Sequence, residues 1–259
     1  MLNYPYGLTF CVGAPRSGTT VFCNLLTEGK SAFPMLPECT YITQLIRLYH
    51  DILNYSDAQR FKAFAKSKAD LADVFSRSID GFIRLAHSHF AHIEGSQLIL
   101  KDPEITIYLD QLRDFFPTAK VVCVVRDPVN VVASMGKVFA KQGRATTFDE
   151  LLSFVFNYYW RASESQLAKS GAMHFVDFEK ILDADESEFQ ATEHFLGYSI
   201  GRSGFGKTFF DFDTTDATHS ANYGQAMARP VRGEVALSED ERLKVQNAFS
   251  GYNLMYKWW

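Results

Sequence analysis

The sequence predicts an α/β fold with one domain over residues 1–259, in which helices flank a central, mainly parallel sheet. Three observations support this. Short apolar runs alternate with segments of helical periodicity, as in parallel sheets whose strands are joined by helices. A length of 259 residues with 47% apolar residues allows one large core. Residues 8–26 read as a buried strand, a turn containing Gly and Pro, and the start of a helix.

Five segments are predicted to be strands. Residues 8–13 form a short apolar run that ends at Gly13. Residues 120–126 are almost continuously apolar, which is typical of a central parallel strand covered on both faces. The other predicted strands are residues 32–36, 97–101 and 173–178.

The predicted helices lie between these strands. The first begins near Gly18 and ends at Gly29, a residue typical of helix C-termini. Apolar residues at helical spacing predict a helical insertion over residues 41–94. Residues 198–236 have little periodicity, and a loop of this length in a compact domain is usually functional or mobile. The remaining helices are predicted over residues 105–116, from Pro128, from Thr147 to about Lys169, over residues 187–197, and from Ser238 to about Tyr252.

Composition limits the possible partners. A net charge of −4 gives no general sign of nucleic-acid binding, although it leaves room for a local basic pocket that holds a small anion. There is no signal-peptide pattern and no run of 18 apolar residues, so no transmembrane helix is expected. The four cysteines lack metal-ligand spacing and are expected to be reduced thiols of a cytoplasmic protein.

Residues 13–20 read G-A-P-R-S-G-T-T, with the glycine spacing of a phosphate-binding loop. Thr19 occupies the position where such loops have lysine. Backbone N–H groups at the helix start can still hold a phosphate, and Arg16, Thr19 and Thr20 can add hydrogen bonds to it. The absent lysine argues against ordinary ATP or GTP hydrolysis. The alternative is that Gly and Pro only shape a strand–turn–helix connection.

This loop resembles the 5′-phosphosulfate loop of sulfotransferases that use 3′-phosphoadenosine 5′-phosphosulfate (PAPS). The stretch VVCVVRDPVNVVASM (residues 121–135) is similar to the 3′-phosphate motif of that family, which has an arginine at a strand end and a serine eight residues later. The pattern is closest to bacterial, carbohydrate and tyrosylprotein sulfotransferases. The resemblance implies the P-loop NTPase-like sulfotransferase fold, PAPS as donor, PAP as product and no required metal. The donor-binding residues that it implies are Pro15, Arg16, Ser17, Gly18, Thr19, Thr20, Arg126 and Ser134.

Catalytic residues are expected where the strands end, because parallel sheets bind ligands at the carboxyl ends of their strands. Sulfuryl transfer needs a base for the acceptor proton and cations that stabilise charge on the leaving oxygen. The resemblance implies that Glu38 is the base, and that Lys101 and Arg16 stabilise the leaving phosphate.

Each of these residues also has a plain structural interpretation. Glu38 could be a carboxylate at the start of a helix. Lys101 could be a surface lysine paired with Asp102 or Glu104, and Arg126 could form a local ion pair with Asp127. Ser134 could be an ordinary helix residue facing a neighbour.

The loop before the last helix resembles a family region that makes further 3′-phosphate contacts. Ser220, Arg229 and Arg232 are the matching residue types, but the match is loose and a solvated loop is an equal alternative for Arg229. Phe178 stands where tyrosine is common in the family, which puts a polar contact there in doubt.

The sequence therefore predicts a PAPS-dependent sulfotransferase that acts on a hydroxyl, or an amine, of a small-molecule, carbohydrate or lipid-linked acceptor. The insertion over residues 41–95 is expected to lie on the acceptor side. One alternative is a P-loop nucleotide kinase or another phosphotransferase. A second is a nucleotide-binding regulator without catalysis. The sequence predicts neither the acceptor nor the oligomeric state.

Overall fold

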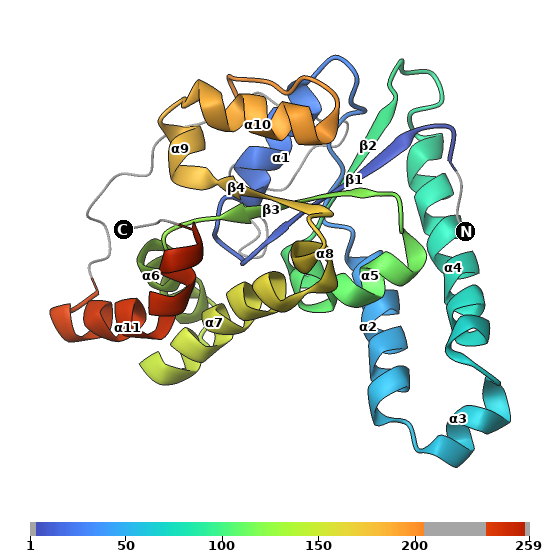
Figure 1. Cartoon of the computed structure of the whole chain (residues 1–259), viewed down its shortest axis with the longest axis horizontal. Helices are drawn as coiled ribbons and strands as arrows, with labels where there is room; N and C mark the ends of the chain where they lie inside the picture. The colour runs from blue at the N-terminus through green and yellow to red at the C-terminus, as the bar shows by residue number, and fades with distance from the viewer. Residues whose placement is uncertain (1–3, 205–236, 257–259) are drawn as a thin grey trace.

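A computed structural model of the chain describes residues 4–204 and 237–256, with side chains up to residue 252. A sheet of four parallel strands lies at its centre, in the order β2-β1-β3-β4 (Figure 1). This confirms the predicted fold class. The strands are β1 (Gly7–Gly13), β2 (Gln97–Lys101), β3 (Lys120–Val125) and β4 (Met173–Asp177).

The strand register brings the carboxyl ends of β1, β2 and β3 to one edge of the sheet. Cys11 pairs with Lys101, and Gly13 pairs with Val124. The loop after β1 therefore begins beside the last residue of β2 and the end of β3. Segments that are about 90 and 110 residues apart in the sequence meet at this edge because parallel strands all point the same way.

Both faces of the sheet are buried, as expected for a parallel sheet. Phe10 and Val12 of β1 join the larger apolar core, and Cys11 between them joins the smaller one, since successive side chains of a strand point to opposite faces. The face with the smaller core is covered by α1 (Thr19–Glu28), α9 (Phe178–Leu182) and α10 (Glu186–Leu196), which lie on one side of the sheet in Figure 1.

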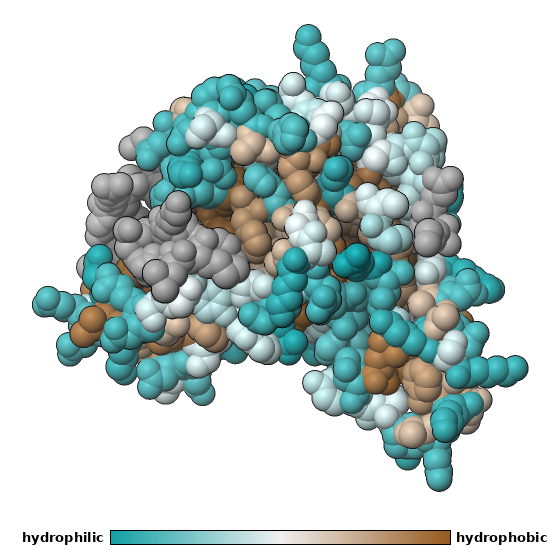
Figure 2. Space-filling view, in the orientation of Figure 1, coloured by the Kyte–Doolittle hydropathy of each residue, from teal (hydrophilic) through white to brown (hydrophobic). Residues whose placement is uncertain are grey.

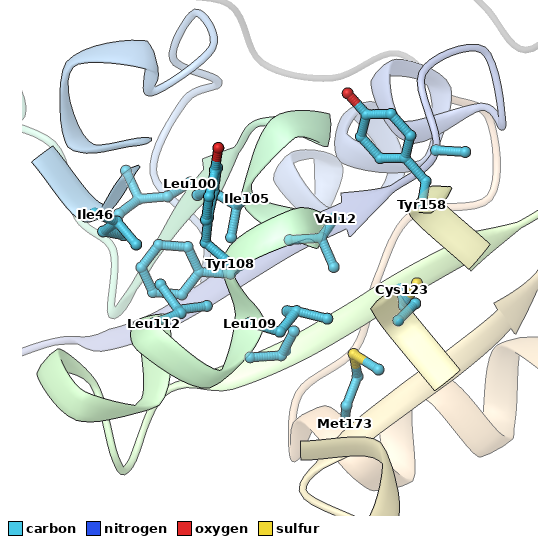
Figure 3. Close-up of a cluster of buried hydrophobic side chains, with 14 of the residues drawn as sticks. Val12, Ile46, Leu100, Ile105, Tyr108, Leu109, Leu112, Cys123, Tyr158 and Met173 are labelled. Atoms are coloured by element: carbon cyan, nitrogen blue, oxygen red, sulfur yellow. The ribbon is translucent and has the colours of Figure 1, made fainter. Parts of the chain in front are cut away.

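Six further helical segments cover the other face. Figure 3 shows Val12, Leu100 and Leu109 among the side chains that meet in the larger core there. These segments are η1 (Pro103–Tyr108, a 3₁₀ helix), α5 (Leu109–Phe115), α6 (Pro128–Lys141), α7 (Phe148–Glu164), α8 (Gln166–Lys169) and α11 (Glu239–Tyr256).

The insertion predicted over residues 41–94 forms a helical arm of three helices that extends away from the sheet (Figure 1). They are α2 (Thr40–Tyr55), α3 (Ala58–Phe64) and α4 (Lys68–Ser88). Asp57 caps α3 through the N–H groups of Gln59 and Arg60, and Ser67 caps α4 through the N–H of Asp70. Short polar residues of this kind favour helix starts, so the chain turns twice at the end of the arm.

The strand predicted over residues 32–36 is wrong. In this segment Ala32 forms an isolated parallel bridge with Gln97, and Met35 is a second isolated bridge residue. The N–H of Phe33 donates to the carbonyl oxygen of Gln97 at 2.9 Å, so the segment lies along the edge strand β2 without forming a regular ladder, and Pro34 is a residue that sheets accept only at such edges. The helix predicted from Thr147 to about Lys169 is also divided, because the Ser165 hydroxyl accepts from the N–H of Ala168 and starts α8.

No helix in residues 4–204 or 237–256 combines the length and the apolar composition that a membrane span requires.

Candidate active site

The loop between β1 and α1 has a backbone that requires glycine at two positions. Gly13 has φ of 138° and Gly18 has φ of 102°, and both angles are rarely adopted by other residues. A Cβ atom on Gly13 would lie 2.4 Å from the carbonyl oxygen of Val124, and one on Gly18 would lie 2.3 Å from the Phe178 ring. The glycine spacing seen in the sequence thus reflects both backbone angle and close packing.

The N-terminus of α1 is open to an anion. Gly18 at the N-cap supplies no side-chain hydrogen bond, and the first turn of α1 contains no acidic residue. The first N–H groups of a helix have no partner within the helix, and the helix dipole gives this end a partial positive charge. Such an end is a common binding site for phosphate groups.

Thr20, Glu38 and Lys101 form a hydrogen-bonded group that we call the lysine cluster. The Lys101 ammonium donates to Glu38 Oε1 at 2.7 Å and to Thr20 Oγ1 at 3.0 Å. The Lys101 side chain is only 1% exposed, whereas that of Glu38 is 41% exposed. Lys101 is therefore not a surface lysine, and its ion pair with Glu38 lies directly beside the phosphate loop.

Backbone and side-chain bonds fix Glu38 and Lys101 relative to each other. The N–H of Cys39 donates to the carbonyl oxygen of Lys101 at 3.0 Å, which ties the start of α2 to the end of β2. The next residue, Asp102, accepts from the Thr43 hydroxyl at 2.6 Å and from the N–H of Glu104 at 2.9 Å. Burial raises the pKa of Asp102 to about 6, against the opposing effect of these two hydrogen bonds.

Arg16, Arg126 and Ser134 form a second group, the arginine cluster. Arg16 Nε donates to Ser134 Oγ at 3.2 Å, and Arg126 Nη1 donates to the carbonyl oxygen of Arg16 at 3.3 Å. Burial, and next the charge on Arg126, lower the pKa of the Arg16 guanidinium. Two cations held this close would be stabilised by a bound anion. Arg16 thus contacts Ser134 of the predicted 3′-phosphate site. Its role in stabilising the leaving phosphate stays a prediction.

Arg126 is held from several sides. Its side chain pairs with Glu179 Oε1 at 3.4 Å and lies over the Phe178 ring, 5.5 Å from the centroid. The Tyr159 hydroxyl donates to the Arg126 carbonyl oxygen at 2.6 Å. Asp127 instead caps α6 by accepting from the N–H of Val129 at 2.8 Å. The ion pair of Arg126 is therefore with Glu179, and the turn pair with Asp127, which was the alternative interpretation of Arg126, does not form.

Three of the predicted donor-binding residues, Ser220, Arg229 and Arg232, lie outside the described residues. Within the loop, Ser17 is fully buried, and its hydroxyl has no hydrogen-bond partner in the described part of the chain. Pro15, Gly18 and Thr19 lie in the turn and the first residue of α1.

Sequence reasoning missed two residues that shape the site. The Thr106 hydroxyl accepts from the Gly13 N–H at 2.8 Å and donates to the Gly13 carbonyl oxygen at 3.1 Å, which anchors the start of the loop to η1. Glu179 binds both Arg126 and the Asn130 side-chain amide. No local pattern marks Thr106, whereas Glu179 directly follows a predicted strand end and could have been found by the strand-end rule.

The family model described as Sulfotransferase family matches residues 9–201, well over half of the chain. The chain belongs to the sulfotransferase family. The match spans the phosphate loop, both clusters and the helical arm, and membership supports sulfuryl transfer as the general activity of this enzyme. No curated protein matches the sequence.

Several solved sulfotransferases have a similar fold. The sulfotransferase domain of the olefin synthase from Synechococcus PCC 7002 is 15% identical, with a TM-score of 0.56 and 95% of each chain covered. The sulfotransferase domain from the curacin biosynthetic pathway is 13% identical, with a TM-score of 0.56, covering 97% of this chain and 99% of that domain. A sulfotransferase from Alicyclobacillus acidocaldarius is 15% identical, with a TM-score of 0.55 and coverage of 98% and 96%. At these identities the similarity shows the fold alone.

Proposed function

We propose that this sulfotransferase moves the sulfuryl group of PAPS to a hydroxyl of a small-molecule, carbohydrate or lipid-linked acceptor. The observation that carries the proposal is the lysine cluster. It joins a carboxylate that solvent can reach, a buried cation and a hydroxyl of the phosphate loop by hydrogen bonds of 2.7 and 3.0 Å. A proton acceptor and a cation side by side are what an acyl- or sulfuryl-type transfer to a hydroxyl requires.

The residues present fit a donor that carries anionic groups at two ends. The open N-terminus of α1, the loop hydroxyls and Lys101 would hold the 5′-phosphosulfate. Arg126 and Ser134 would hold the 3′-phosphate, with Ser220, Arg229 and Arg232 as further predicted contacts. Bidentate or charge-assisted bonds from arginine suit phosphate oxygens, and this supports the assignment of the arginine cluster to the 3′ end.

In the proposed reaction, the acceptor oxygen forms a bond to sulfur as the bond between sulfur and the phosphate oxygen breaks, and PAP leaves. Glu38 takes the proton of the acceptor hydroxyl, since its carboxylate is partly exposed while Lys101 holds it in place. Lys101, between Glu38 and Thr20, stabilises negative charge at the loop. Arg16 is proposed to assist from the side of Ser134.

We also propose a cytoplasmic location. Cys11, Cys23, Cys39 and Cys123 are all free thiols. Burial raises the pKa of the Cys123 thiol to about 12, which keeps it protonated and unreactive. Free thiols of this kind persist in reducing compartments.

Nucleotide-dependent thermal stabilisation tests the proposed donor. A ligand that binds only the folded state raises Tm as its concentration exceeds Kd. We expect PAP to raise Tm in a saturable manner and ATP with Mg²⁺ to leave it unchanged. Stabilisation by ATP with Mg²⁺ and none by PAP would favour a nucleotide kinase. A regulator without catalysis would bind PAP yet transfer nothing, with Glu38 dispensable.

A further inference from the structure

The end of the helical arm differs in charge from the rest of the chain. We define the arm tip as residues 55–68, which comprise the end of α2, all of α3 and the start of α4. It contains four cationic residues and one carboxylate, whereas the whole chain has a net charge of −4. A positive region on a negative protein is a candidate contact for an anionic surface.

Two cations of the arm tip have carboxylate partners and two do not. Arg60 pairs with Asp57 at 3.1 Å, and Lys68 pairs with Asp114 at 2.8 Å. Lys62 and Lys66 are exposed and make no ion pair within residues 4–204 and 237–256. Their ammonium groups are thus available to an anionic partner.

Two aromatic side chains of the arm tip project into solvent. Phe64 is 94% exposed and Tyr55 is 78% exposed, the highest values among the exposed large apolar residues of the described chain. Figure 1 shows α3 at the far end of the arm from the sheet, and Figure 2 shows apolar surface beside hydrophilic surface at this end. Exposed aromatic residues next to lysines match the pattern of segments that lie in a membrane interface.

We propose that the arm tip docks on the surface of an anionic lipid bilayer. Phe64 and Tyr55 enter the headgroup region, where amphipathic and aromatic rings are stabilised, and Lys62 and Lys66 bind the anionic headgroups. A projecting tip can enter a soft interface directly, whereas a stable protein complex buries about 800 Å² on each partner around a well-packed centre. The shape of the tip therefore favours a bilayer over an acidic protein.

This docking contact is separate from the proposed active site. Glu38 precedes α2, and the arm tip lies at the opposite end of that helix of 16 residues, which is about 24 Å long. Vesicle binding and PAP binding are therefore independent measurements. A failure of the docking proposal leaves the proposed reaction untouched, and the converse also holds.

Co-sedimentation with lipid vesicles tests the proposal. We expect the full chain to bind vesicles of phosphatidylcholine mixed with phosphatidylserine, to release at high salt, and not to bind vesicles of phosphatidylcholine alone. Lys62→Gln with Lys66→Gln should weaken binding roughly 30-fold, since each lysine near an anionic surface contributes about a fivefold factor. Phe64→Ala should weaken it about tenfold through lost apolar burial.

The matched control is Lys30→Gln with Lys141→Gln, which removes the same charge from exposed positions outside the arm. It should bind vesicles like the unmodified chain, and all variants should keep the same Tm. The proposal is overturned if the unmodified chain does not bind the anionic vesicles, or if the tip variants bind as well as the control. Binding to soluble polyglutamate without binding to vesicles would also overturn it, in favour of an acidic protein partner.

Discussion

The lysine cluster and the arginine cluster lie at the same edge of the sheet, but their charges are balanced differently. In the lysine cluster, one buried cation faces one partly exposed carboxylate, Glu38. In the arginine cluster, Arg126 pairs with one carboxylate, Glu179, which also binds Asn130, while the second guanidinium group, that of Arg16, donates to the Ser134 hydroxyl. The first arrangement contains a base next to a cation, and the second contains mainly positive charge. This difference supports our proposal that the lysine cluster serves the chemical step and the arginine cluster serves donor binding.

Substitution of Glu38 should have the largest effect and separate the two clusters most clearly. Glu38→Gln keeps the shape but removes the base, so turnover should fall by about 10²–10⁴-fold. PAP affinity should stay close to that of the unmodified enzyme, because the arginine cluster is intact. Steady-state transfer assays and calorimetric titration with PAP measure the two quantities.

The matched control for this substitution is Glu94→Gln, at an exposed position outside both clusters. Equal turnover rates of the two variants would show that Glu38 is not the general base. If Glu38→Gln also lost PAP affinity, the lysine cluster would contribute to donor binding as well, and the two clusters would not have separate roles.

Arg126→Gln should show the opposite pattern. Loss of hydrogen bonds to a charged group costs about 1.5–3 kcal/mol, so PAP affinity should fall roughly 10- to 100-fold. Glu179 is partly exposed and tolerates the loss of its partner, so Tm should change little. Turnover at saturating PAPS should be reduced far less than kcat/KM. The exposed Arg113→Gln is the control, and equal PAP affinity in both variants would contradict the binding role.

Asp102→Asn tests how firmly the lysine cluster is held. The raised pKa of Asp102, about 6, means that the folded state binds a proton more tightly than the unfolded state does. The contribution of this group to stability is therefore present at acidic pH and is lost as pH rises through about 6. Asparagine removes this dependence while it can still accept from the N–H of Glu104 and bond to Thr43.

The expected readout for Asp102→Asn is the difference in unfolding free energy between variant and parent. It should increase from about pH 4 to about pH 7.5, by on the order of 2 kcal/mol. Denaturant unfolding at several pH values measures it, with the exposed Asp73→Asn as control. A difference that does not vary with pH would show that Asp102 has an ordinary pKa.

Ser134→Ala should have the smallest effect. The Ser134 hydroxyl accepts from Arg16 and is the proposed partner of the 3′-phosphate. Loss of one hydrogen bond of about 0.5–1.5 kcal/mol should weaken PAP binding roughly 2- to 12-fold, with turnover at saturating PAPS almost unchanged. Ser153→Ala on the exposed face of α7 provides the reference. Equal PAP affinities of the two variants would show that Ser134 is an ordinary residue of α6 with no role in donor binding.

The fold could be predicted from sequence because buried parallel strands are apolar throughout, and because Gly13 and Gly18 mark the loop by their spacing. The error over residues 32–36 arose because apolar composition was given more weight than Pro34, a residue that disfavours a regular strand, and the segment forms only isolated bridges. The arm was predicted as helical, but its two turns depend on the caps at Asp57 and Ser67.

The site was only partly predictable, because some of its contacts join segments that are far apart in the sequence. Lys101 and Arg126 follow from the rule that ligands bind where parallel strands end, and the structure brings them beside the loop. Glu38 was found through the family resemblance, because the segment before it is not a strand. Thr106 is part of the site only because the fold places η1 against Gly13, which no local pattern encodes. The structure groups the predicted residues into two clusters, and their roles in the reaction remain predictions.

Transfer of label from sulfur-labelled PAPS is the measurement that tests the central claim most directly. The unmodified enzyme and Glu38→Gln would each be incubated with labelled PAPS and an extract of the source cells. The proposed reaction predicts a labelled acceptor and an equal amount of PAP with the unmodified enzyme, and almost no label transfer with Glu38→Gln. No labelled acceptor from an enzyme that binds PAP, or equal labelling by both proteins, would contradict it.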